Sequence, residues 1–219
     1  MKYEYQLFFA NLESKTPLNM KKLLFSALTI VSAGLMAFNY SNELPIGSQI
    51  PKAEVKMKDV SGKDISLNDA KKKNGLLVMF SCNTCPYVIK NQDRTVEISK
   101  YATEKNVGVI LVNSNEAKRS DDDSYEAMKS YAKAQGYKWH YVVDEKSALA
   151  DAFGANRTPE VFLFNSEGKL IYHGAIDDNP SDAGAVSRKH LKEAIDESVA
   201  GKNVSVQTSR SVGCTIKRI

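Results

Sequence analysis

The chain has 219 residues, of which 42% are hydrophobic and 26% are charged, so it is long enough to bury one core without relying on disulfides. Its three cysteines, Cys82, Cys85 and Cys214, are too few for a small disulfide-rich scaffold. The net charge of +4 is spread along the sequence, and its one basic block, Lys71-Lys72-Lys73, is more typical of a solvated turn than of a nucleic-acid surface. We therefore expect no nucleic-acid partner.

The N-terminal region has the features of an export signal. Lys21 and Lys22 precede an uncharged apolar run of 16 residues, 23–38, which has small residues near its end. A membrane-spanning helix needs about 20 apolar residues, so we predict a cleaved signal peptide over 20–37 rather than an anchor. Residues 1–19 contain acidic and polar residues that are unusual before a signal, which indicates an upstream extension with translation starting at Met20. The predicted location is extracytoplasmic, in the periplasm or an equivalent compartment, with membrane contact only if the signal segment is retained.

After a linker over 38–46, the sequence alternates between strand and helix patterns. Residues 53–67 alternate around a turn and predict a hairpin, and the apolar run 75–80 predicts a buried strand. A helix is predicted over 86–105, which contains no glycine and no proline after Pro86. Further strands are predicted over 107–112, 139–144, 159–164 and 169–174, and further helices over 123–135, 147–153 and 191–200. This order predicts an α/β fold with a mixed central sheet flanked by helices.

The two neighbouring cysteines, in the stretch "MFSCNTCPYV", follow the predicted strand 75–80 directly. Cys85 falls in the first turn of the next helix, where Pro86 is well accommodated. The free N–H groups and dipole of that turn favour a thiolate at Cys82 and lower its pKa. We therefore predict that an exposed Cys82 is the nucleophile and that Cys85 resolves the mixed disulfide, so that the oxidised pair is Cys82–Cys85.

Other uses of a C-x-x-C pair remain open. Haem attachment requires a histidine where the chain has Pro86, which argues against it. A metal-binding carrier would need further ligands, and the candidates, Cys214 and three histidines, are each solitary in the sequence. A purely structural clip would close a very short loop and stabilise little. Redox chemistry is the favoured interpretation.

The region 47–200 resembles the thioredoxin-fold redoxins, the superfamily that includes the alkyl hydroperoxide reductase and thiol-specific antioxidant proteins. The resemblance is closest to exported members of peroxiredoxin-like type and depends on "FSCNTCPYV", "NSNEAKRSDDDSYEAM", "RTPEVFLFNSEGKLIYHGAIDD" and the tail "SVGCTIK". It implies a thioredoxin-like fold with an N-terminal hairpin and an insertion, a cis bond between Thr158 and Pro159, and exposed backbone there with which a substrate chain can pair. It also implies thiol:disulfide exchange with protein partners and an upstream electron donor or acceptor, with no organic cofactor and no metal.

The sequence also departs from the family patterns. Neither cysteine has the P-x-x-x-T-x-x-C frame of peroxiredoxins, so thiol peroxidase activity is the alternative function and not the first. The buried acid of thioredoxin is replaced by Met79. Glu160, directly after Pro159, is the nearest acidic candidate to take the proton of Cys85, and a surface glutamate without a role is the competing interpretation.

Cys214 lies in a tail, 201–219, after the last predicted helix. Its polar, glycine-containing surroundings predict a flexible segment that could extend to the other two cysteines. The favoured interpretation is an accessory or free thiol, and the alternative is a third redox-active cysteine.

Overall fold

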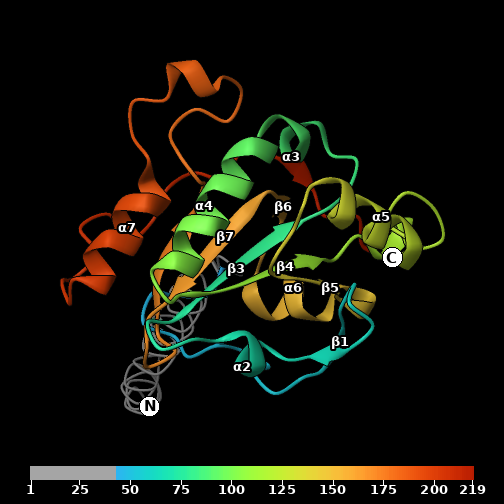
Figure 1. Cartoon of the computed structure of the whole chain (residues 1–219), viewed down its shortest axis with the longest axis horizontal. Helices are drawn as coiled ribbons and strands as arrows, with labels where there is room; N and C mark the ends of the chain where they lie inside the picture. The colour runs from blue at the N-terminus through green and yellow to red at the C-terminus, as the bar shows by residue number, and fades with distance from the viewer. Residues whose placement is uncertain (1–42) are drawn as a thin grey trace, which may run out of the picture. The chain divides into compact units, whose positions relative to one another are not determined.

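The computed structural model describes residues 43–219 (Figure 1). The predicted upstream extension, the signal peptide and most of the predicted linker therefore lie outside the described residues. Leu44 and Ile46, at the end of that linker, pack against the core of the domain. Within 43–219, no helix is both long enough and apolar enough to cross a bilayer.

A five-stranded mixed sheet forms the centre of the domain, in the order β5-β4-β3-β7-β8. Strand β3 pairs in parallel with β4 and antiparallel with β7, so the prediction of a mixed sheet is confirmed. The predicted N-terminal hairpin is confirmed as β1 paired with β2. The strands are β1 Met57–Lys58, β2 Asp64–Ile65, β3 Leu76–Ser81, β4 Gly108–Asn113, β5 His140–Val143, β6 Arg157–Thr158, β7 Glu160–Phe164, β8 Leu170–Gly174 and β9 Cys214–Thr215.

Helices cover both faces of the sheet, because successive side chains of each buried strand point to opposite sides. On β3, Leu77 and Met79 join the core beneath α4 and α7, which lie side by side in Figure 1. Leu76, Val78 and Phe80 join the opposite core, which includes residues of α2 and α6. The helices are α2 Leu67–Ala70, α3 Pro86–Lys90, α4 Gln92–Glu104, α5 Tyr125–Ala134, α6 Ala148–Phe153 and α7 His190–Val199, with single 3-10 turns η1 Glu116–Lys118, η2 Glu145–Ser147 and η3 Ala183–Ala185.

Two helix predictions need correction. The single helix predicted over 86–105 is two helices, α3 and α4, because Asn91 leaves the helical conformation between them. The helix predicted over 123–135 starts later than expected: Asp123 was expected to cap it, but Ser124 is the N-cap of α5 and accepts from the N–H of Ala127. Asp123 is completely buried and has other partners.

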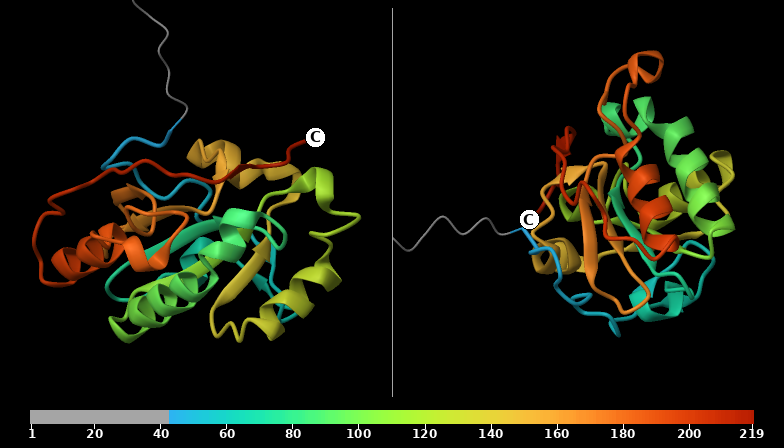
Figure 2. Two further views of the ribbon diagram at one scale, coloured as in Figure 1. Left: turned by 90° about the horizontal axis from the view of Figure 1, so that it is seen from above. Right: turned by 90° about the vertical axis from the view of Figure 1, so that its left-hand side faces the viewer.

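The C-terminal tail is hydrogen-bonded to the domain along its length and is not the flexible segment that its composition predicts. Figure 2 shows it, in red, running from α7 across the domain to the C-terminus. Thr208 forms a bridge with His173 on the outer strand β8, and β9 pairs with β6. Ile216, which is 3% exposed, packs into the core that contains Phe80.

Candidate active site

The ends of three strands meet at one edge of the sheet and position the site. Strands β3 and β4 are parallel and both end there, at Ser81 and Asn113, while the antiparallel strand β7 begins there at Glu160. Cys82 therefore leaves the sheet next to the start of β7. Cys85 is the N-cap of α3 and Pro86 is its first residue, as predicted.

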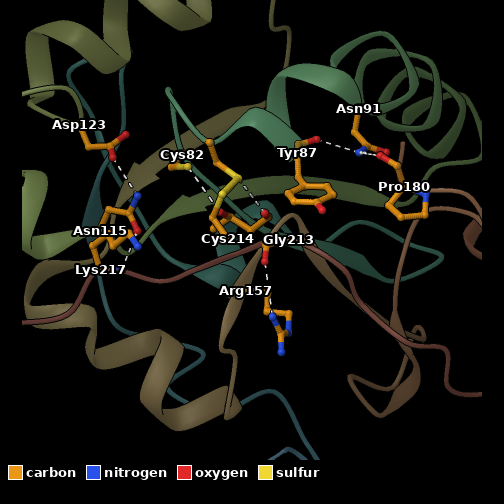
Figure 3. The surroundings of a disulfide bond; sticks show 12 residues. Cys82, Tyr87, Asn91, Asn115, Asp123, Arg157, Pro180, Gly213, Cys214 and Lys217 are labelled. Atoms are coloured by element: carbon orange, nitrogen blue, oxygen red, sulfur yellow. Dashed lines mark hydrogen bonds between the residues drawn. A yellow bond between two sulfur atoms is a disulfide. The ribbon is translucent and has the colours of Figure 1, made fainter. Parts of the chain in front are cut away.

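The structure contains a disulfide between Cys85 and Cys214, with the two Cα atoms 6.1 Å apart and a sequence separation of 129. The predicted pairing of Cys82 with Cys85 is not the one present, and Cys82 is a free thiol. Cys214 is likewise not a free accessory thiol. Figure 3 shows Cys82 beside the disulfide, and Cys214 packs against the small cluster of Cys82, Cys85 and Val88.

The surroundings of Cys82 overturn the prediction of an exposed thiol with a lowered pKa. Cys82 is only 1% exposed, and this burial raises the pKa of its thiol, with the negative charge of Asp123 acting in the same direction. The hydroxyl of Thr158 and the backbone N–H groups of Cys85 and Thr84 act in the opposite direction. These two N–H groups belong to the loop and the N-cap immediately before α3 and not to its first turn, and desolvation outweighs them.

Thr158 contacts both cysteines of the C-x-x-C pair. Its Oγ1 lies 3.4 Å from Sγ of Cys82, and its carbonyl oxygen lies 3.3 Å from Sγ of Cys85. A disulfide sulfur has no proton to donate, so the second contact becomes a hydrogen bond only when Cys85 is a thiol. The Thr158–Pro159 bond is cis, which confirms the expectation from the family resemblance.

Glu160 is neither a surface residue nor a partner of the cysteines. It is 4% exposed, and its Oε2 accepts from the backbone N–H groups of Asn156 and Arg157. Its Oε1 lies 2.8 Å from Nε2 of His173. These contacts hold the backbone at the start of β6, and none of the hydrogen bonds of Glu160 reaches Cys85.

The backbone beside Pro159, expected to be open for a substrate chain, is paired with the protein's own tail. Strand β9 runs antiparallel to β6, with Cys214 opposite Thr158 and Thr215 opposite Arg157. Gly213 lies directly on this backbone, because a Cβ built on it would be 2.2 Å from the carbonyl oxygen of Thr158. The tail thus occupies the edge at which an extended chain would add as a strand.

A buried polar network that the sequence analysis missed connects the C-x-x-C loop to the tail. Asp123 accepts from the backbone N–H of Asn83 and from the side-chain amides of Asn113 and Asn115. Oδ1 of Asn115 in turn accepts from the backbone N–H of Lys217, as Figure 3 shows. The signal was present in sequence as Asn113-Ser114-Asn115, polar residues that follow a buried strand.

The three histidines are dispersed. His173 pairs with Glu160, and His140 lies 3.6 Å from Asp59. Within residues 43–219, no three His, Cys, Asp or Glu side chains are grouped so as to hold a metal ion.

The fold and the cysteine cluster together define a thioredoxin-fold protein with a thiol–disulfide centre. The Redoxin family model matches residues 45–187, and the chain belongs to the Redoxin family. No curated protein matches it.

Two solved structures are similar in sequence as well as in fold. An uncharacterized conserved protein from Geobacillus kaustophilus is 32% identical, with a TM-score of 0.75 over 81% of this chain and 94% of that one. A hypothetical protein from Sinorhizobium meliloti 1021 is 30% identical, with a TM-score of 0.74 over 81% of this chain and 96% of that one. The C-terminal domain of a Bacteroides thetaiotaomicron protein named as a thiol-disulfide oxidoreductase shares the fold at 20% identity, with a TM-score of 0.55 over 72% of this chain and 97% of that domain.

Proposed function

We propose that the protein is an extracytoplasmic thiol:disulfide oxidoreductase that exchanges disulfides with protein substrates through Cys82 and Cys85. One observation carries the proposal: a disulfide at Cys85 lies against a free thiol, Cys82, and both contact Thr158 before the cis proline. A thiol held beside a disulfide is the arrangement that thiol–disulfide exchange requires. The reaction needs no organic cofactor, because the sulfurs themselves carry the electrons.

Membership of the Redoxin family and the fold shared with the named oxidoreductase domain support this chemistry. The extracytoplasmic location rests on the export signal predicted from sequence. A disulfide persists more readily outside the reducing cytoplasm, so the bond at Cys85 agrees with export. The partners we propose are protein thiols or disulfides and an upstream electron donor or acceptor.

A turnover assay tests the proposal. The mature chain is incubated with insulin and dithiothreitol, and reduction of the insulin disulfides is followed by turbidity. We expect the wild type to accelerate reduction roughly tenfold or more over the reductant alone. We expect Cys85→Ser to remove the acceleration, because Cys85 is the cysteine that is bonded to Cys214 and also lies beside the free thiol of Cys82. The proposal would be contradicted if the wild type neither accelerated insulin reduction over the reductant alone nor accelerated the oxidation of a reduced protein.

Two parallel measurements address the alternative functions. Catalytic consumption of hydrogen peroxide by Cys85→Ser, in the absence of disulfide exchange by the wild type, would assign a thiol peroxidase that acts through a Cys82 sulfenic acid. Stoichiometric metal in protein purified without chelator, lost in Cys82→Ser, would assign a metal carrier.

A further inference from the structure

The three cysteines differ in how a partner can reach them. Cys82 is 1% exposed and Cys85 is 5% exposed, whereas Cys214 is partly exposed at the surface of the tail. Thiol–disulfide exchange requires the attacking sulfur to approach its target directly, so access limits the rate. In this arrangement a partner's sulfur can approach Cys214 but not Cys82.

The tail is fixed on both sides of Cys214. Before it, Ser209 donates its backbone N–H to the carbonyl of His173 and accepts from the N–H of Ala175 through its side chain. After it, the backbone N–H of Ile216 donates to Asn156. None of these contacts involves the disulfide, so each of them can also form when Cys85 and Cys214 are reduced.

We propose that Cys214 is a third redox-active cysteine, the thiol at which partner proteins exchange disulfides with the buried pair Cys82 and Cys85. The proposal rests on the proposed function and names the point of contact with the partner. When the three cysteines of this protein are reduced, the group that reacts on the partner is a protein disulfide.

Each step balances as an exchange of one sulfur for another. The Cys214 thiolate attacks the partner disulfide, and one partner sulfur leaves as a thiolate and takes a proton from water. The Cys85 thiolate then attacks Sγ of Cys214 and releases the second partner thiol, which gives the Cys85–Cys214 disulfide seen in the structure.

Cys82 completes the relay. After losing its proton it attacks Sγ of Cys85, the Cys85–Cys214 bond breaks, and the electron pair leaves on Cys214, which takes up a proton. The partner disulfide has then been reduced to two thiols, and two protein thiols have been oxidised to one disulfide. The reverse sequence oxidises a partner dithiol.

Single-cysteine variants of the mature chain test which sulfur meets the partner. The probe is a cysteine peptide joined to 2-nitro-5-thiobenzoate as a mixed disulfide, whose attack by a thiol releases a coloured anion. We expect the variant that keeps Cys214 to react roughly tenfold or more faster at pH 7 than the variant that keeps Cys82, because burial hinders the latter. The difference should disappear in guanidinium chloride, and equal rates in the folded proteins would overturn the proposal.

Turnover of insulin by Cys214→Ser separates this proposal from the proposed function. We expect the variant to lose roughly tenfold or more of the wild-type rate, because the buried pair has no surface thiol to serve it. A variant as fast as the wild type, or faster, would overturn the relay and leave the oxidoreductase function standing. An inactive wild type would instead remove the proposed function.

Gly213→Val provides a test that leaves all three sulfurs in place. Its side chain would collide with the carbonyl of Thr158, at the 2.2 Å approach of a Cβ, and lift the tail from β6. We expect turnover to fall toward that of Cys214→Ser, while the control Gly184→Ala, in the exposed turn η3, keeps the wild-type rate. Unchanged or faster turnover in Gly213→Val would contradict a relay through the docked tail.

Discussion

Cys82 is a thiol on which burial and hydrogen bonding act in opposite directions. The start of α3 supplies donors that favour the thiolate, but the docked tail and the sheet exclude water, and the carboxylate of Asp123 lies nearby. Because this burial raises the pKa of Cys82, the thiolate is less favoured here than at an exposed cysteine.

This environment makes a prediction about alkylation. In reduced protein at pH 7, iodoacetamide should modify Cys214 first and Cys82 last, as measured by mass spectrometry of timed samples. A raised pKa means that the reactive thiolate of Cys82 forms only as the pH rises beyond the usual cysteine value of about 8.5, so its labelling rate should still be increasing there. If Cys82 were the fastest-labelled site at pH 7, the argument from burial would be contradicted. Denatured protein is the control, in which the three cysteines should be labelled at similar rates.

A second prediction concerns a single buried residue, Glu160. Glu160→Ala would leave two backbone N–H groups and His173 without their buried partner, so we expect a loss of about 2–4 kcal/mol in the free energy of unfolding. The matched control, Glu167→Ala, removes an exposed glutamate and should leave that free energy nearly unchanged. Equal denaturation midpoints for the two variants would show that the pairing with β6 and His173 contributes little.

Among the elements, the five strands of the central sheet could be predicted from sequence because each is a short, largely apolar run, whereas β6 and β9 have no such pattern and were not predicted. Leu76 to Ser81 and Gly108 to Asn113 lie close to their predicted positions. The break at Asn91 had no proline or glycine to mark it. The cis bond at Pro159 was expected only through the family resemblance.

The pairing of the cysteines could not be predicted in the same way. A C-x-x-C motif indicates a local pair, whereas the observed disulfide depends on contacts between β6 and a tail far away in sequence. The role of Asp123 was hidden for a similar reason. An acidic residue before a helix has a sufficient local explanation, and its burial among three asparagines depends on how β3, β4 and α5 meet.

The link from Asp123 through Asn115 to Lys217 predicts that the loop and the tail respond together. Asn115→Ala should loosen β9 without touching a sulfur, so hydrogen exchange at the amides of Ile216 and Lys217 should become faster, as should alkylation of reduced Cys85. The control Asn203→Ala changes an exposed asparagine of the tail and should leave both unchanged. Protection at Lys217 equal to that of the wild type would show that the tail is held by its other contacts alone.

At the scale of the whole molecule, the disulfide couples stability to redox state. The bond between Cys85 and Cys214, at a sequence separation of 129, restricts the unfolded chain, and the chain-entropy model values this restriction at about 5 kcal/mol. We expect the oxidised wild type to unfold at higher denaturant concentration than the reduced protein, and Cys214→Ser to resemble the reduced protein in either condition. Identical midpoints for the oxidised and reduced wild type would contradict this coupling.

The same bond turns most of the domain into a closed covalent ring of polypeptide, from Cys85 through four strands of the central sheet and on to Cys214. A single backbone cut within the ring, for example by a protease acting on the exposed loop around Ser181, opens the ring but does not divide the molecule. Nicked protein should therefore migrate as one species on a gel without reductant and as two fragments with it, whereas nicked Cys214→Ser should give two fragments in both. In any oxidising compartment a cleaved copy would therefore remain one covalent molecule until the disulfide was reduced.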